Sequence, residues 1–261
     1  MKQIPNLFTL LNLIFGCIAI VYMLEPGLLL LPLDDDGNIL STPRQLEYTP
    51  EKVLWASAFI GLAAVVDFLD GFIARAFNAS SELGKQLDSL ADTVSFCVAP
   101  SIIVYQFLKL SYAQHSGALD VSFFWLTPAF IIAAAGAYRL GKFNLDTTQS
   151  FSFKGVPTPA VGLLVASFPL IYWYSRDTTV IGILLNKWFW YGFILVISYL
   201  MVSNLPIMSL KFKDFSLKNN IPKIILLVVS IALGVLLKWM AVPLIFLIYI
   251  AVSLAFKKRV S

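Results

Sequence analysis

Residues 67–92 read Asp67-Phe68-Leu69-Asp70-Gly71-Phe72-Ile73-Ala74-Arg75, then eight residues, then Gly84-Lys85-Gln86-Leu87-Asp88-Ser89-Leu90-Ala91-Asp92. Four of the chain's 15 Asp and Glu residues therefore lie together, between long apolar segments. Carboxylates at membrane depth are costly and usually serve a function. Any account of the fold and the function has to explain these four aspartates.

The composition is that of a polytopic membrane protein. Of the 261 residues, 59% are hydrophobic and 13% are charged, and the mean hydropathy of +0.81 lies outside the usual range for soluble domains. Cys17 and Cys97 both fall in apolar runs, so they indicate neither a disulfide framework nor a Cys/His metal site. The first apolar segment is long and lacks a small-residue cleavage pattern, which predicts a retained helix rather than a signal peptide.

A spanning helix needs about 20 mostly apolar residues, and eight segments approach this length. They cover approximately residues 4–24, 53–75, 88–109, 122–141, 157–175, 186–204, 221–237 and 239–256. We expect an all-α membrane helix bundle that forms a single integral-membrane domain over residues 1–261. Its core would cover about residues 1–204, and the helices within 221–256 would be additions whose role the sequence leaves open.

The basic residues indicate the orientation. With the N-terminus in the cytoplasm, 13 of the 19 Lys and Arg residues fall on the inner side and six on the outer side. This bias predicts a multi-pass protein of the cell membrane with both termini cytoplasmic and with residues 67–92 at the cytoplasmic face. Loop 25–52 reads as an external connection with an acidic turn, and segment 205–221 as a basic interfacial loop. His115 has no companion histidine and predicts no site.

The spacing of the four aspartates brings their side chains together. Asp67 and Asp70 are three residues apart and Asp88 and Asp92 are four apart, so each pair shares a helix face. Two antiparallel helices would aim all four carboxylates at one point, where they repel one another unless cations lie among them. Oxygen ligands without His or Cys suit Mg²⁺, Mn²⁺ or Ca²⁺.

The neighbouring residues favour a phosphate-bearing substrate. Gly71 and Gly84 remove side chains beside the acidic face and leave room for a bulky ligand, and Arg75 and Lys85 bring positive charge close to it. Divalent cations and an arginine are suited to hold a diphosphate. Two alternatives remain at this point: a cation-coupled transporter that uses the aspartates as its ion site, and structural Asp–Arg pairing.

The full pattern resembles the signature of the CDP-alcohol phosphatidyltransferase family, D-x2-D-G-x2-A-R-x8-G-x3-D-x3-D. Every fixed position is filled, by Asp67, Asp70, Gly71, Ala74, Arg75, Gly84, Asp88 and Asp92. The resemblance implies transfer of a phosphatidyl group from CDP-diacylglycerol to an alcohol, with release of CMP. It also implies a homodimer in the lipid bilayer and no nucleic-acid partner.

The resemblance assigns roles to individual residues. The four aspartates Asp67, Asp70, Asp88 and Asp92 would hold two divalent cations, Mg²⁺ or Mn²⁺, and Asp92 would also be the catalytic base that takes the proton of the attacking hydroxyl. The CDP-diacylglycerol site would be lined by Pro5, Asn6, Thr9, Gly71, Arg75, Ser81 and Gly84.

Three strings resemble the phosphatidylserine synthase branch of the family. They are the opening Ile4-Pro5-Asn6-Leu7-Phe8-Thr9-Leu10-Leu11-Asn12, the string Arg139-Leu140-Gly141-Lys142-Phe143-Asn144, and the string Phe153-Lys154-Gly155-Val156-Pro157-Thr158-Pro159. Lys142 and Val156 stand where that branch has arginine and leucine, and the first exchange loses the guanidinium fork. The resemblance implies L-serine as the acceptor, with Arg139, Lys142, Asn144 and Lys154 in its site.

Charge supports the serine assignment only weakly. The carboxylate of serine needs a cation, and Arg139, Lys142 and Lys154 flank one predicted cytoplasmic loop. They could equally be ordinary anchors at the inner membrane surface. Glycerol phosphate, inositol phosphate and the archaetidylserine type of substrate remain open as alternatives, and the sequence specifies no lipid tail.

Overall fold

The computed structural model describes residues 4–24, 50–77, 81–113, 121–145, 152–208 and 221–256. The predictions for the acidic run at 34–36, for His115 and for most of segment 205–221 concern residues outside these ranges.

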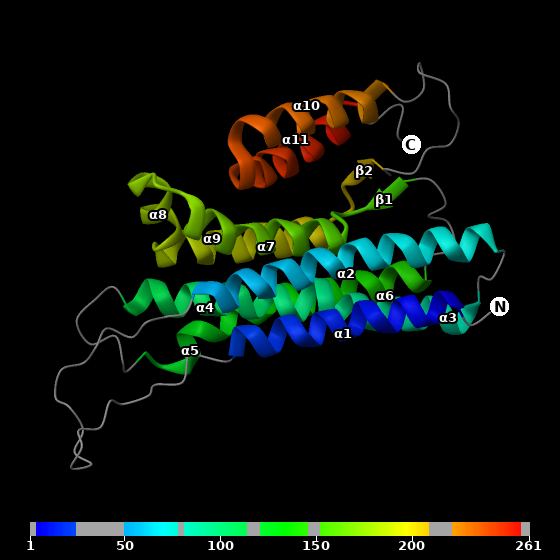
Figure 1. Ribbon diagram of the computed structural model, residues 1–261, viewed down its shortest axis with the longest axis horizontal. Coiled ribbons are helices and arrows are strands. Elements are labelled where there is room, and N and C mark those ends of the chain that lie inside the picture. The colour runs from blue at the N-terminus through cyan, green and yellow to red at the C-terminus, as the bar shows by residue number, and fades with distance from the viewer. Residues whose placement is uncertain are drawn as a thin grey trace, which may run out of the picture.

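Within the described ranges the chain is almost entirely helical (Figure 1). The first half forms α1 (Ile4–Leu24), α2 (Pro50–Ala76), α3 (Glu82–Asp92), the π-helix η1 (Thr93–Val98), α4 (Ala99–Ala113), α5 (Phe123–Leu126), the 3₁₀ turn η3 (Thr127–Phe130) and α6 (Ile131–Leu145). The second half forms β1 (Ser152–Lys154), α7 (Thr158–Tyr174), α8 (Thr178–Leu184), α9 (Lys187–Val202), β2 (Pro206–Met208), α10 (Ile221–Leu237), the 3₁₀ turn η4 (Lys238–Met240) and α11 (Ala241–Ala255).

The predicted all-α class is confirmed, and each of the eight predicted apolar segments corresponds to a helical segment. Five helical stretches of the described chain are long and apolar enough to cross a membrane. The pair α8 and α9, bent by 66° at a short break, makes a sixth when it is counted as one span. Five or more such stretches are those of a multi-pass membrane protein.

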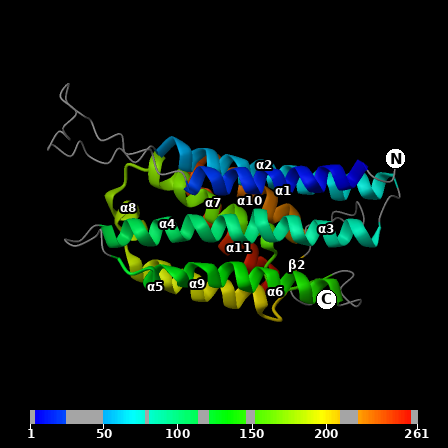
Figure 2. The same ribbon diagram turned by 90° about the horizontal axis from the view of Figure 1, so that it is seen from below.

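The long helices run side by side along one axis, as two perpendicular views show (Figures 1 and 2). Helix α1 begins, α2 ends and α3 begins at the same end of this bundle, so the start of the first helix meets the region where α2 passes into α3. The opposite end carries α5 and α8.

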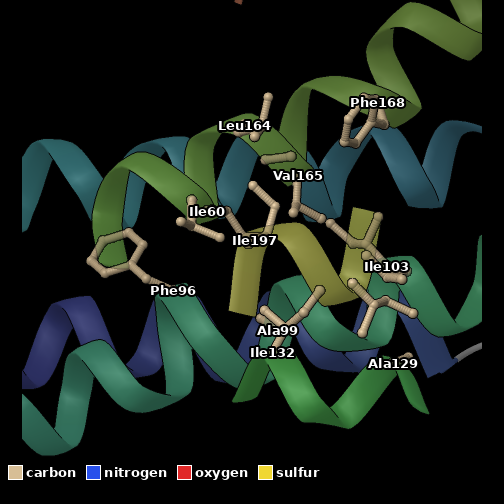
Figure 3. Close-up of a cluster of buried hydrophobic side chains, with 14 of the residues drawn as sticks. Ile60, Phe96, Ala99, Ile103, Ala129, Ile132, Leu164, Val165, Phe168 and Ile197 are labelled. Carbon is tan, nitrogen blue, oxygen red and sulfur yellow. The ribbon is translucent and has the colours of Figure 1, made fainter. Parts of the chain in front are cut away.

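The apolar core lies between α2, α4, α6, α7 and α9 (Figure 3). Ile60, Ile103 and Ile132 are fully buried, and Phe168 packs edge-to-face on Trp190 at 5.2 Å between ring centroids. Leucines and valines on the outer faces of the same helices are exposed, which suits contact with lipid.

The π-helix η1 is the centre of the packing. Pro100 has no backbone N–H and its ring crowds the carbonyl of Phe96, so the α-helical bonding pattern cannot continue there. Residues 93–98 instead form a π-helix, a feature often found at functional sites. Glycines of three other helices contact it most closely: Gly16 lies against Ser95, Gly162 against Phe96 and Gly136 against Cys97.

A two-stranded antiparallel ribbon interrupts the helical fold and was not predicted. Strand β1 pairs with β2 in the register Ser152 to Met208 and Lys154 to Pro206. The residue after β1, Gly155, has φ +80°, and a Cβ there would collide with the carbonyl oxygens of Met201 and Ser203. Residues 206–208, part of the segment predicted to be an interfacial loop, are therefore a strand that follows α9 and pairs with β1, which precedes α7.

The last two helices form a hairpin. Helices α10 and α11 lie side by side (Figure 1), and the chain reverses at η4, where Lys238 adopts φ +51°. Helix α11 packs against α7 and β2, whereas much of α10 is exposed.

Candidate active site

The site is built on a polar stripe of α1. Asn6, Thr9 and Asn12 are spaced by three residues in an otherwise apolar helix, and all three side chains are buried. Residues at this spacing share one helix face. Because α1 packs against α2, α3 and η1, this face lies against the helices that carry the four aspartates.

Three of the aspartates form one group. Asp67, Asp70 and Asp88 each offer a carboxylate oxygen, and these oxygens lie within 4.8 Å of one another. The Thr9 hydroxyl lies 2.7 Å from Oδ2 of Asp70 and 3.2 Å from the carbonyl oxygen of Pro5, and the shorter distance favours donation to the carboxylate. Such an all-oxygen donor set fits a hard divalent cation, and the group contains no sulfur or imidazole ligand.

Asp92, the last residue of α3, is not part of this group and is as buried as Asp70. Its side chain is 6% exposed, and Nδ2 of Asn12 donates a hydrogen bond of 3.1 Å to Oδ1. Asp92 interacts electrostatically with Asp67, Asp70 and Asp88, and more weakly with the buried Arg139.

The hydrogen bond from Asn12 is itself held in place. The Ser95 hydroxyl lies 3.0 Å from the carbonyl oxygen of Asn12 and 3.0 Å from that of Ala91, so η1 is tied to the backbone of α1. Gly16, one turn further along α1, allows the two backbones to approach closely. The π-helix thus fixes the position of Asp92 relative to α1.

A recess of about 540 Å³ opens beside the acidic group. It is lined by Pro5, Asn6, Thr9, Ala74, Ser81, Glu82, Gly84, Lys85 and Asp88. The Ser81 hydroxyl caps α3 by accepting a hydrogen bond of 3.0 Å from the backbone N–H of Gly84. A Cβ at Gly84 would lie 3.0 Å from Oδ1 of Asn6, so glycine keeps this wall of the recess open.

The predicted CDP-diacylglycerol residues separate into two sets. Five of them line the recess: Pro5, Asn6, Thr9, Ser81 and Gly84. Gly71 and Arg75 lie outside the lining, and Arg75 is exposed near the end of α2. The recess also includes Glu82, to which the sequence gave no role, and Lys85, which the sequence placed close to the acidic face.

The residues predicted to bind serine are in different environments. Arg139 is 8% exposed, and its Nε has no hydrogen-bond partner among the described residues. Nζ of Lys142 donates to Oδ1 of Asn204 at 3.0 Å, and Nδ2 of Asn144 donates to the Ser89 hydroxyl at 2.8 Å. Lys154 lies on β1 opposite Pro206, and its side chain is outside the described part of the structure.

Sequence reasoning gave no role to Asn12, although it is the residue that contacts Asp92. The signal that would have found it is the three-residue spacing of Asn6, Thr9 and Asn12 within an apolar helix. The sequence also gave no role to Ser89, whose hydroxyl on α3 accepts the hydrogen bond from Asn144 on α6.

The profile of the CDP-alcohol phosphatidyltransferase family matches residues 2–197, and the chain belongs to this family. The CDP-diacylglycerol–serine O-phosphatidyltransferase of Helicobacter pylori (strain J99) is 30% identical over 219 residues, which is 82% of this chain and 75% of the relative. The enzyme of the same name from Bacillus subtilis (strain 168) is 31% identical over 172 residues, or 66% of this chain and 78% of the relative. The archaetidylserine synthase of Methanothermobacter thermautotrophicus is 34% identical over 117 residues, or 44% of this chain and 46% of the relative.

The resemblance expected from the sequence, to this family and to its serine-using branch, is thus confirmed.

Proposed function

We propose that the protein is a phosphatidylserine synthase, an enzyme that converts CDP-diacylglycerol and L-serine into phosphatidylserine and CMP. The observation that carries this proposal is the position of Arg139, a buried cation within electrostatic reach of Asp92 whose Nε has no hydrogen-bond partner among the described residues. A buried N–H donor without a hydrogen-bond partner is unfavourable, and the carboxylate of a small substrate would accept a charge-assisted hydrogen bond from it. The relatives named above are serine-using enzymes, which supports the same acceptor.

At phosphorus the reaction forms one P–O bond and breaks another, and a proton is transferred with them. The hydroxyl oxygen of serine bonds to the phosphorus of the phosphatidyl group, the bond from that phosphorus to the CMP oxygen breaks, and the serine proton moves to Asp92. The hydrogen bond from Asn12 occupies Oδ1 of Asp92, which leaves Oδ2 for this proton.

The three grouped carboxylates would hold the cation that the reaction needs. We propose two divalent cations, Mg²⁺ or Mn²⁺, on Asp67, Asp70, Asp88 and Asp92; bound there, they would neutralise the diphosphate and stabilise the departing CMP. The protein itself contributes the arrangement of the carboxylates, fixed through Thr9 and Asn12.

The two substrates would bind on different sides of Asp92. The recess lined by Asn6, Ser81 and Gly84 is proposed to take the CDP part, with Arg75 and Gly71 at its margin. Serine would lie on the Arg139 side of Asp92, with Lys142, Asn144 and Lys154 around it. The two substrates would then meet at Asp92.

The proposed site faces the cytoplasm, where serine is dissolved. The positive-inside bias supports this, because α2 ends, α3 begins and α6 ends at this end of the bundle (Figure 1), and these helix ends carry Arg75, Lys85, Arg139 and Lys142. We further propose that residues 1–204 are the catalytic core, that both termini are cytoplasmic and that the protein is a homodimer in the cell membrane.

The proposal is tested with purified protein, CDP-diacylglycerol and labelled serine in the presence of Mg²⁺ or Mn²⁺. We expect labelled phosphatidylserine and an equal amount of CMP. The control is Asp92→Asn, which should lose turnover while it retains CDP-lipid binding, since Asp67, Asp70 and Asp88 would still offer carboxylate oxygens to a cation. Turnover in that variant would remove Asp92 from the role of the base, and a cation transporter would release no CMP at all.

A further inference from the structure

The residues from 203 to 208, between α9 and the end of β2, contact two parts of the proposed acceptor site, Lys142 and strand β1. Asn204 accepts the hydrogen bond from Lys142 at 3.0 Å. Pro206 is the strand partner of Lys154, and the backbone N–H of Gly155 donates to the carbonyl oxygen of Leu205 at 2.9 Å. We refer to residues 203–208 as the acceptor segment.

A three-residue strand with one partner cannot hold itself in place. Isolated two-stranded ribbons are marginal in stability, and the outer edge of such a strand has unpaired N–H and C=O groups. In this protein the strand β2 is buried at Ile207 and Met208, where unpaired backbone groups are costly. Some other element has to satisfy the edge at Met208.

That element is α11. The Tyr249 hydroxyl donates to the carbonyl oxygen of Met208 at 2.8 Å, and the N–H of Met208 donates to the Ser253 hydroxyl oxygen at 3.2 Å. Ser253 in turn donates to the carbonyl oxygen of Tyr249 at 2.7 Å, one turn earlier on the same helix. Both polar groups of Met208 are thus satisfied by two side chains of one helix.

Tyr249 also lies near the proposed serine site. It is buried, and it is close enough to Arg139 for the two side chains to interact electrostatically. Tyr249 therefore contacts the end of the acceptor segment and lies close to the cation that would bind the serine carboxylate. Neither Tyr249 nor Ser253 is among the described residues that line the recess proposed for the CDP part.

We propose that the hairpin of α10 and α11, which lies beyond the family-matched residues 2–197, is the element that sets the affinity for the acceptor alcohol. Tyr249 and Ser253 are positioning residues: they fasten Met208 and thereby hold the acceptor segment, Lys142 and β1 against Arg139. This inference rests on the proposed function, because it takes the Arg139 side as the serine side.

The test is a comparison of two Michaelis constants in Tyr249→Phe and in Ser253→Ala. Tyr249→Phe removes one hydroxyl and keeps the ring, so it deletes the bond to Met208 with little change in packing. We expect the KM for serine to rise about threefold to tenfold, while the KM for CDP-diacylglycerol and kcat stay within about twofold. Tyr199→Phe is the matched control, because Tyr199 is 71% exposed on α9, and it should change none of the three constants.

The outcomes separate the two proposals. Wild-type protein that forms no phosphatidylserine overturns the proposed function and this inference with it. Wild-type protein that forms phosphatidylserine, with both variants unchanged in serine KM, overturns this inference alone. An equal rise of both Michaelis constants, or complete loss of activity in both variants, also overturns it, since α11 would then support the whole fold rather than the acceptor side.

Discussion

Replacement of Asn12 by alanine tests how the base is positioned. Asn12 is 0% exposed, and its Nδ2 lies 3.1 Å from Oδ1 of Asp92. Asn12→Ala removes the donor and leaves a buried carboxylate without the partner that orients it. A hydrogen bond to a charged group contributes about 1.5–3 kcal/mol.

The expected magnitude follows from that energy. Because about 1.4 kcal/mol corresponds to a factor of ten in rate, we expect kcat to fall about tenfold to hundredfold. The KM for CDP-diacylglycerol should change little, because Asn12 is not among the residues that line the recess. The assay is CMP release at saturating serine and CDP-lipid, together with lipid titration of each variant.

Asn186→Ala is the matched control. Asn186 caps α9 by accepting a hydrogen bond of 2.9 Å from the N–H of Trp188, at the opposite end of the bundle (Figure 1). Its loss costs about 1 kcal/mol of stability, so it mimics a general destabilisation without touching the site. If kcat of Asn12→Ala stays at the wild-type value, or falls no further than that of Asn186→Ala, Asn12 does not position the base.

Three further substitutions probe the cation group, the acceptor side and the packing at η1. Thr9→Val removes the hydrogen bond to Asp70 and should raise the Mg²⁺ or Mn²⁺ concentration for half-maximal activity by about tenfold or more, while chelation abolishes activity in both proteins; an unchanged cation requirement would exclude this role for Thr9. Arg139→Ala should raise the serine KM more than the CDP-lipid KM, and an equal effect on both would identify Arg139 as a structural anchor. Gly136→Ala places a methyl group against Cys97 and should lower stability by about 1–3 kcal/mol in thermal unfolding. Gly192→Ala is the control: its added carbon has open space around it, so the stability should not fall. Equal unfolding temperatures of the two variants would argue against close packing at η1.

Local spacing explains how much of the site could be predicted. Asp67 and Asp70 lie on one helix, as do Asp88 and Asp92, so their shared faces follow from helix geometry alone. The apolar segments were found for a similar reason, since length and composition define them without any knowledge of their partners. The bundle and the acidic group were therefore accessible from the sequence.

The remaining features depend on contacts between distant residues. Asn12 and Asp92 are 80 residues apart, and nothing near either of them indicates the hydrogen bond that joins them. The ribbon could not be predicted because β1 and β2 have three residues each and are separated by α7, α8 and α9. Such short strands carry no periodic signal.

The burial of Arg139 is the third feature that the sequence left open. A count of basic residues in loops predicts orientation but does not distinguish a surface anchor from a buried cation. The structure distinguishes them: Lys142 is exposed, whereas Arg139 lies inside the bundle next to Asp92. The acceptor assignment therefore rests more on Arg139 than on the net charge of the loop.

An acceptor panel tests the central claim most directly. Purified protein receives CDP-diacylglycerol, a divalent cation and equal concentrations of L-serine, glycerol 3-phosphate or inositol phosphate in separate reactions, and both CMP and the lipid product are measured. We predict phosphatidylserine and CMP in equal amounts with serine, and only background CMP with the two phosphates. Consumption of glycerol 3-phosphate or inositol phosphate in place of serine would contradict the claim.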